Sequence, residues 1–166
     1  CNLLRIVLLT NILRHTKKER QPRQITSMTK ILIFGLPGSG KSTLAEPFAE
    51  LIGGVWINAD VVRRRYDDWD FSLEGRVRQA QRMKHLADGV IMAGKIVVAD
   101  FVCPTESARS EFAPDYTVWM DTIKEGRFED TNKMFVIPDK YDVKVTEKNK
   151  KMWAIKIKQI ILENNK

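Results

Sequence analysis

The stretch GLPGSGKS at positions 35–42 constrains this chain more than any other part of the sequence. It matches the pattern G-x-x-x-x-G-K-[ST] in full, follows the apolar run ILIF and opens the amphipathic segment KSTLAEPFAELIG. The glycines let the backbone curl so that successive N–H groups face a phosphate, and the following helix presents its positive end to the same anion. The pattern therefore predicts a strand, a phosphate-binding loop and a helix, in that order.

The fixed residues of this loop also predict its ligands. Lys41 can reach the β- and γ-phosphates of a nucleotide, and the Ser42 hydroxyl can join the shell of a Mg²⁺ ion. We therefore expect ATP and Mg²⁺ as cofactors. The residues expected to contact the nucleotide are Gly35, Pro37, Gly38, Ser39, Gly40, Lys41, Ser42 and Thr43.

Short β-rich runs alternate with helical patterns from residue 30 onward. We expect strands at 30–35, 54–58, 96–100, 116–120 and 141–146, several of them apolar enough to be covered on both faces. Helices are expected at 72–93, between a capping serine and Gly94, and at about 147–163. The alternation predicts an α/β fold: a three-layer P-loop NTPase fold with a mostly parallel sheet of about five strands and helices on both faces.

The charge of the chain is concentrated near its start. The 166 residues carry a net charge of +7, and residues 1–27, with six basic side chains and one acidic, account for five of these charges. The remaining charge gives little support for a nucleic-acid partner. No run approaches the roughly 18 apolar residues of a membrane span. Two distant cysteines favour a cytoplasmic, reducing setting over a disulfide framework. We expect a small, anionic, nucleotide-like partner and leave a homodimer open.

The first 27 residues form a separate unit in our interpretation. Met28 stands directly before the first strand, which suggests that translation begins there. Residues 1–27 are then a non-native or disordered extension without a structural role, and residues 28–166 are the P-loop kinase domain. A targeting peptide and an additional helix remain as alternatives.

Two carboxylates are expected at the edge of the sheet where ligands bind in such folds. Asp60 follows the strand VWIN and Asp100 closes the strand KIVVAD. One can act as the general base toward an acceptor hydroxyl, and the other can support Mg²⁺. With Lys41 they are the predicted catalytic residues; Ser42 and Asp100 are the predicted metal site. The alternative is that either aspartate only caps the helix that follows it.

Three further motifs resemble those of the adenylylsulfate kinase family: NADVVR at 58–63, DFSLEGR at 70–76 and DFVCP at 100–104. The family reads D-G-D-N-[IV]-R, G-F-S-x-x-D-R and S-F-I-S-P. The resemblance implies transfer of the ATP γ-phosphate to the 3′-hydroxyl of adenosine 5′-phosphosulfate, within sulfate assimilation. It further implies that the substrate is contacted by Arg63, Phe71, Arg76, Phe101 and Pro104. Core packing is the alternative for both phenylalanines.

The resemblance weakens after Asp121. The family's lid and its F-T-G substrate loop are not matched, although Arg127 and Lys133 can supply the cations of a lid. Two alternatives to adenylylsulfate kinase therefore remain. One is a related kinase with another hydroxyl acceptor: a nucleoside, a sugar acid or a polynucleotide. The other is an ATP-binding regulatory module without transferase activity.

Overall fold

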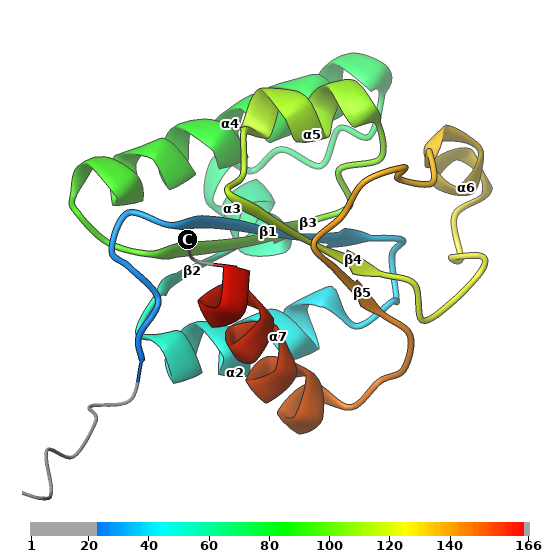
Figure 1. Cartoon of the computed structure of the whole chain (residues 1–166). Helices are drawn as coiled ribbons and strands as arrows, with labels where there is room; N and C mark the ends of the chain where they lie inside the picture. Colours follow the sequence, from blue (N-terminus) through cyan, green and yellow to red (C-terminus); the bar gives the residue numbers. More distant parts are fainter. Residues whose placement is uncertain (1–22, 165–166) are drawn as a thin grey trace, which may run out of the picture.

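A computed structural model describes residues 23–164 and shows one five-stranded sheet between two layers of helices (Figure 1). Every strand pairing is parallel, and the strand order is β2-β3-β1-β4-β5. The strands are β1 (Lys30–Gly35), β2 (Val55–Asn58), β3 (Val97–Phe101), β4 (Tyr116–Met120) and β5 (Val143–Val145). The predicted sheet is confirmed, and it is wholly parallel within the described residues.

The central strand sets the position of the phosphate loop. All six residues of β1 are buried, because β3 and β4 flank the strand and helices cover both of its faces. Gly35 at its end pairs with Met120 of β4, and Asp100 of β3 pairs with Asn58 of β2. Parallel pairing thus brings the carboxyl ends of four strands to one edge of the sheet.

Two groups of helices cover the two faces of the sheet (Figure 1). One face is covered by α2 (Lys41–Ile52) and α7 (Lys150–Asn164), which also pack on each other. The other face is covered by α3 (Ala59–Tyr66), α4 (Leu73–Met92) and α5 (Glu106–Phe112). A short helix, α6 (Glu129–Met134), lies between β4 and β5 in the sequence. In the part of the chain that the structure describes, no helix has the length and apolarity needed to cross a membrane.

Helix α4 begins where its sequence predicts. The Ser72 hydroxyl accepts a hydrogen bond from the backbone N–H of Gly75, and Gly94 follows the helix with a positive φ of 75°. Met83 and Ala87 are buried, and Ala80, Leu86, Val90 and Ile91 pack against the same core, whereas Val77 is exposed. The Val77 side chain of α4 therefore does not pack against the core.

The chain before β1 takes part in the core. Ile25 is 6% exposed and packs with the residues that lie between the sheet, α2 and α7. The interpretation that residues 1–27 have no structural role is therefore wrong for Ile25. The part of that segment formed by residues 1–22 lies outside the described residues.

We predict that Ile25→Ala lowers the free energy of unfolding by about 2 kcal/mol, because it removes buried methyl groups at the edge of the core. Met28→Ala is the matched control, since Met28 is 56% exposed and its truncation should change stability by less than about 0.5 kcal/mol. Urea unfolding measures both. Equal stabilities for the two variants would show that the fold gains nothing from Ile25.

Candidate active site

The phosphate loop has a backbone that its glycines make possible. Gly38 and Gly40 have positive φ angles of 84° and 92°, which L side chains rarely adopt. A Cβ atom on Gly35 would lie 2.8 Å from the backbone oxygen of Met120, so glycine is needed where β1 and β4 meet. The loop then enters α2 at Lys41, whose Nζ donates to the backbone oxygen of Leu36 at 2.9 Å.

Side chains from outside the loop hold its carbonyl groups. The Thr122 hydroxyl donates to the oxygen of Ser39 at 2.6 Å, and Lys148 Nζ donates to the oxygen of Gly38 at 2.9 Å. Thr122 follows β4, and Lys148 lies between β5 and α7. These two hydrogen bonds therefore fix the shape of the loop before any phosphate binds. A loop that is already ordered loses less conformational entropy when the ligand binds.

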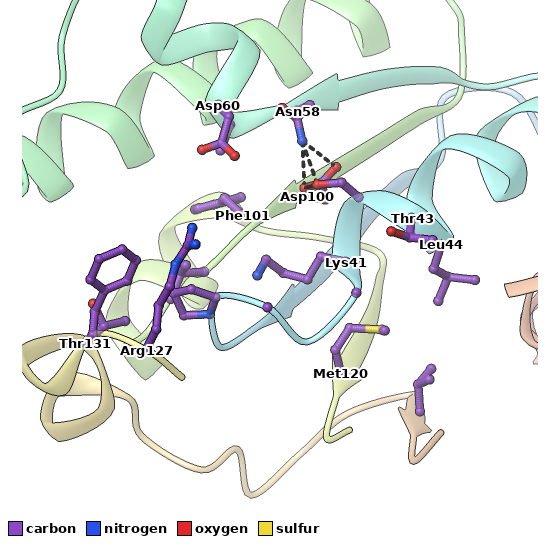
Figure 2. A pocket seen from close by; sticks show the side chains of 18 of the residues that line it. Lys41, Thr43, Leu44, Asn58, Asp60, Asp100, Phe101, Met120, Arg127 and Thr131 are labelled. Carbon is purple, nitrogen blue, oxygen red and sulfur yellow. Dashed lines mark hydrogen bonds between the residues drawn. The ribbon is translucent and has the colours of Figure 1, made fainter. Parts of the chain in front are cut away.

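Asp100 is the centre of a buried cluster next to the loop. It accepts a hydrogen bond from Asn58 Nδ2 at 3.1 Å (Figure 2). It also accepts from Ser42 Oγ at 3.0 Å and from Trp56 Nε1 at 2.6 Å. Asn58 Nδ2 also donates to Ser42 Oγ at 2.8 Å. Burial raises the pKa of the Asp100 carboxyl, while these donors and Lys41 oppose the increase. Asp100 is therefore a buried hydrogen-bond acceptor that connects β2, β3 and α2, and it does not cap a helix.

The donor set of this cluster suits a magnesium ion. Ser42 and Asp100 present a hydroxyl and a carboxylate side by side, and Mg²⁺ prefers a few such oxygen ligands together with phosphates and water. Within residues 23–164 no group of three or more His, Cys, Asp or Glu side chains could hold a metal by itself. The site fits a metal that arrives with the nucleotide.

Lys41 lies in a strongly desolvating position. It is 9% exposed, and burial lowers the pKa of its ammonium group to about 8, against the opposing attraction of Asp100 and Asp60. An anion bound in the loop would favour the charged form. Phosphate binding and protonation of Lys41 are therefore coupled.

A cavity of about 950 Å³ lies between this loop and residues of the motifs at 58–63, 70–76 and 100–104. Figure 2 shows Lys41, Asp60 and Arg127 pointing toward a common space beside Phe101. Most of the predicted site residues line the cavity: Pro37, Gly38, Gly40, Lys41, Ser42, Thr43, Asp60, Phe71, Arg76, Asp100, Phe101 and Arg127. Five predicted residues do not: Gly35, Ser39, Arg63, Pro104 and Lys133.

Asp60 has the exposure that a reactive carboxylate needs. It lies in the first turn of α3, but Asn58 is the residue that caps this helix, with its side chain accepting from Val61 N at 3.0 Å. The alternative that Asp60 serves only as a cap is thus excluded. Asp60 opens into the same cavity as Lys41.

The two phenylalanines differ in their environments. Phe71 is 51% exposed, so core packing does not explain it. Phe101 is 6% exposed and packs edge-on against Phe112 with ring centroids 5.4 Å apart, although it also lines the cavity. Phe101 is a wall of the cavity, and Phe71 is the ring that remains available to a ligand.

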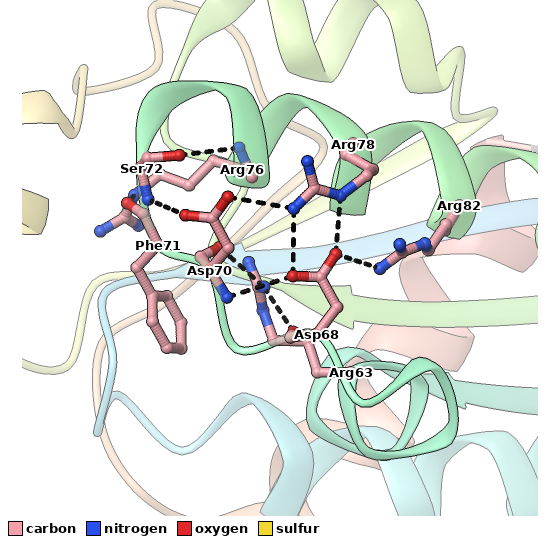
Figure 3. A network of polar contacts seen from close by, with 9 residues as sticks. Arg63, Asp68, Asp70, Phe71, Ser72, Arg76, Arg78 and Arg82 are labelled. Atoms are coloured by element: carbon pink, nitrogen blue, oxygen red, sulfur yellow. Dashed lines mark hydrogen bonds and ion pairs between the residues drawn. The ribbon is translucent and has the colours of Figure 1, made fainter.

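Arg63 is placed differently from what the resemblance implies. Its guanidinium donates to the backbone oxygens of Asp68 and Asp70 at 3.0 Å each and lies 4.4 Å from the centre of the Phe71 ring (Figure 3). It is 5% exposed and does not line the cavity. Arg64, the next residue, lines the cavity instead. The expected substrate contact by Arg63 is therefore corrected to support of the loop at 67–72.

Two other expected contacts are also corrected. The backbone oxygen of Pro104 accepts from Arg109 Nη2 at 3.0 Å and from Val136 N at 2.8 Å, and Pro104 lies outside the cavity lining. Lys133 pairs with Glu129 at 2.7 Å, and both side chains are exposed. Of the two proposed lid cations, only Arg127 reaches the cavity.

Several residues of the site escaped the sequence reasoning. Trp56 and Asn58 hold Asp100, Lys148 holds the loop, and Trp69 and Phe128 add aromatic side chains to the wall. The position of Asn58 at the end of a strand was a usable signal, because that edge gathers ligand-binding groups. Lys148 had no such signal, since it lies 110 positions from its partner.

Comparison with known proteins gives the class of this chain. The profile of the AAA domain family matches residues 31–114, about half of the sequence, so the chain belongs to this family of P-loop proteins. Its fold is that of P-loop kinases. The APS kinase CysC of Mycobacterium tuberculosis, solved with AMPPNP and APS, has a TM-score of 0.67 at 18% identity and covers 85% of this chain and 99% of its own.

Two more relatives extend this result. An adenylyl-sulfate kinase of Bacillus velezensis is 27% identical over 139 residues, which are 80% of this chain and 64% of that protein. A shikimate kinase of Acinetobacter baumannii, solved with shikimate, has a TM-score of 0.60 at 22% identity and covers 82% of this chain and 95% of its own. The chain spans between 11% and 64% of the length of the curated relatives that it matches. The profile match shows the family, and the structural likenesses show the fold.

We predict that the affinity for ATP is constant below pH 8 and falls up to about tenfold per pH unit above it, because Lys41 must be protonated to bind phosphate. Calorimetry at pH 7.0–9.5 in buffers of different ionisation enthalpy measures the affinity and the accompanying proton uptake. Lys41→Arg keeps its charge throughout this range and should give a weaker but flat profile. A flat profile for the unaltered protein would contradict the coupling.

Proposed function

We propose that this protein is an ATP-dependent kinase that phosphorylates a hydroxyl group of a small, anionic molecule. One observation carries the proposal: the phosphate-loop lysine and the exposed residue Asp60 line a single cavity. A nucleotide-binding module needs only the loop. A phosphotransferase also needs a carboxylate beside the acceptor, cations around the transferred group and a wall that excludes water.

The donor half of the site, which would bind ATP, is formed around the phosphate loop. Its backbone N–H groups and the N-terminus of α2 would bind the β-phosphate of ATP, and Lys41 Nζ would reach the β- and γ-phosphates. Ser42 and Asp100 would hold Mg²⁺, and Trp56 orients the Asp100 carboxylate. The metal would neutralise negative charge on the phosphates during transfer.

The transfer step assigns a role to Asp60. The acceptor oxygen attacks the γ-phosphorus and forms a new P–O bond, while the bond from that phosphorus to the β–γ bridging oxygen breaks and ADP leaves. The proton of the hydroxyl passes to the Asp60 carboxylate. Arg64 and Arg127 line the same space and would stabilise the charge on the transferred group.

Adenosine 5′-phosphosulfate is the acceptor that we propose first, with transfer to its 3′-hydroxyl. The half-exposed ring of Phe71 can stack on a purine, and Arg64 and Arg127 provide cations for a phosphosulfate. The sequence likeness to adenylyl-sulfate kinases supports this choice. A role in sulfate assimilation in the cytoplasm would follow from it.

A related kinase with another acceptor is the second candidate. Arg63 and Pro104 lie outside the cavity, so two of the five positions implied for this substrate do not face it. Lys133, one of the two expected lid cations, faces solvent. The likeness to a shikimate kinase shows that the same fold accompanies other acceptors. A nucleoside, a sugar acid or a polynucleotide terminus therefore belongs in the same test.

We expect MgATP and adenosine 5′-phosphosulfate to give ADP and a phosphorylated product, detected by mass spectrometry, and Asp60→Asn to lower kcat by roughly 100-fold or more. The affinity for ATP should change less than about twofold, because Asp60 is no part of the donor half. Asp139→Asn is the matched control and should leave kcat unchanged, because Asp139 is exposed and lies between α6 and β5, outside the cavity lining.

Three other outcomes separate the alternatives. Product only from another hydroxyl compound in the panel would keep the kinase and replace the acceptor. Full activity of Asp60→Asn would refute the role of Asp60 as the base. Tight ATP binding without turnover of any acceptor would refute the kinase proposal and favour a regulatory module.

A further inference from the structure

Arg76 joins two parts of the cavity wall, the loop before α4 and helix α6, through one guanidinium group. Its Nε donates to the backbone oxygen of Phe71 at 2.9 Å, and its Nη2 donates to Asp130 Oδ2 and to Thr131 Oγ1, each also at 2.9 Å. Only 12% of the side chain is exposed. Nε and Nη2 of this arginine are thus already engaged by the protein, although the residue lines the cavity.

The elements that Arg76 joins carry different halves of the proposed reaction. On one side is the acceptor loop, residues 67–72, with the half-exposed Phe71 ring. On the other side is the lid segment, residues 126–134, which contains α6 and presents Arg127 to the cavity. The lid segment also approaches the phosphate loop, because a Cβ atom on Gly126 would lie 3.0 Å from the oxygen of Pro37.

The acceptor loop is held firmly on its far side. Arg63 binds the backbone oxygens of Asp68 and Asp70, and Arg78 binds the carboxylates of the same two residues (Figure 3). A Cβ atom on Gly75 would lie 2.3 Å from the oxygen of Asp70, so the loop packs directly on the first turn of α4. Because the acceptor loop is fixed in this way, its position can determine that of the lid segment through Arg76.

The chemistry of the Arg76 contact favours a rigid link between the acceptor loop and the lid segment. A guanidinium group is a planar fork whose donors have fixed relative directions, so its three acceptors cannot shift independently. Thr131 is 2% exposed, and loss of a hydrogen bond at such a site costs more than at the surface. The exposed Asp130 carboxylate contributes less.

We propose that Arg76 is a positioning residue that couples the acceptor loop to the lid segment, so that an acceptor bound at Phe71 sets Arg127 against the phosphate being transferred. Its effect on turnover rests on the proposed kinase function. In this proposal Arg76 acts through the lid segment, and direct binding of the acceptor by Arg76 is the outcome that would overturn it. The resemblance had implied a place beside the substrate.

A double-mutant cycle tests this coupling. Arg76→Met and Thr131→Val should each lower kcat about tenfold with the acceptor used in turnover, while the Kd for ATP changes less than about twofold. The double variant should be no more than about twofold slower than Arg76→Met, because both changes break the same link. Lys84→Met is the control, since it removes an ion pair with Asp88 further along the same helix and should leave kcat unchanged.

Two kinetic results would overturn the proposal. The first is that Arg76→Met raises only the KM of the acceptor and leaves kcat unchanged, while Thr131→Val changes neither constant. This result would mean that Arg76 binds the acceptor directly. The second is full additivity of the two changes, which would mean that they act independently.

Hydrogen exchange provides a readout that needs no turnover. In the free protein, Arg76→Met should speed exchange of the amides of α6 about tenfold and leave those of α2 unchanged. Unchanged exchange in α6 would overturn the coupling even in an active enzyme. If no acceptor is phosphorylated, the proposed function fails, and faster exchange in α6 would still support the link between the two segments.

Discussion

The site depends on the buried carboxylate of Asp100 and the groups that surround it. Ser42 lies in the first turn of α2, Asn58 ends β2, and Trp56 lies within β2; all three donate to Asp100 in β3. A carboxylate at this depth is costly unless its oxygens are paired. Its partners therefore fix the spacing between the loop and the neighbouring strand, and Asp60, two residues after Asn58, takes its place from the same constraint.

The cavity is built in two ways. Its donor half consists of backbone groups, whose shape follows from glycines and from the close meeting of β1 and β4, together with the side chains of Lys41, Ser42 and Asp100. Its acceptor half consists of side chains from α3, α4, the loop between them and the lid segment. Backbone geometry of the first kind accepts any nucleoside triphosphate, whereas specificity for the acceptor must come from the second kind. The specificity for the acceptor can therefore change while the binding of the nucleotide stays the same.

The sequence predicted the features that depend on local pattern. Apolar runs of strand length alternating with helical patterns indicated the parallel sheet, and the glycine-rich loop indicated its own geometry. Asp60 and Asp100 could be placed because parallel strands end at one edge. The orientation of Arg63 could not be predicted, because it depends on two carbonyl groups in a loop whose path is set by Gly75 and Arg78. The burial of Ile25 likewise depends on packing against helices far along the chain.

A crystal structure with Mg²⁺ and a non-hydrolysable ATP analogue tests the central claim most directly, namely that one cavity holds the donor phosphates and presents them to Asp60. The account predicts the β-phosphate inside the loop at 35–42, the metal on Ser42 Oγ, and the γ-phosphate between Lys41 Nζ and the Asp60 carboxylate. A nucleotide whose base lies against Phe71, or whose γ-phosphate points toward Glu147 and away from Asp60, would contradict it.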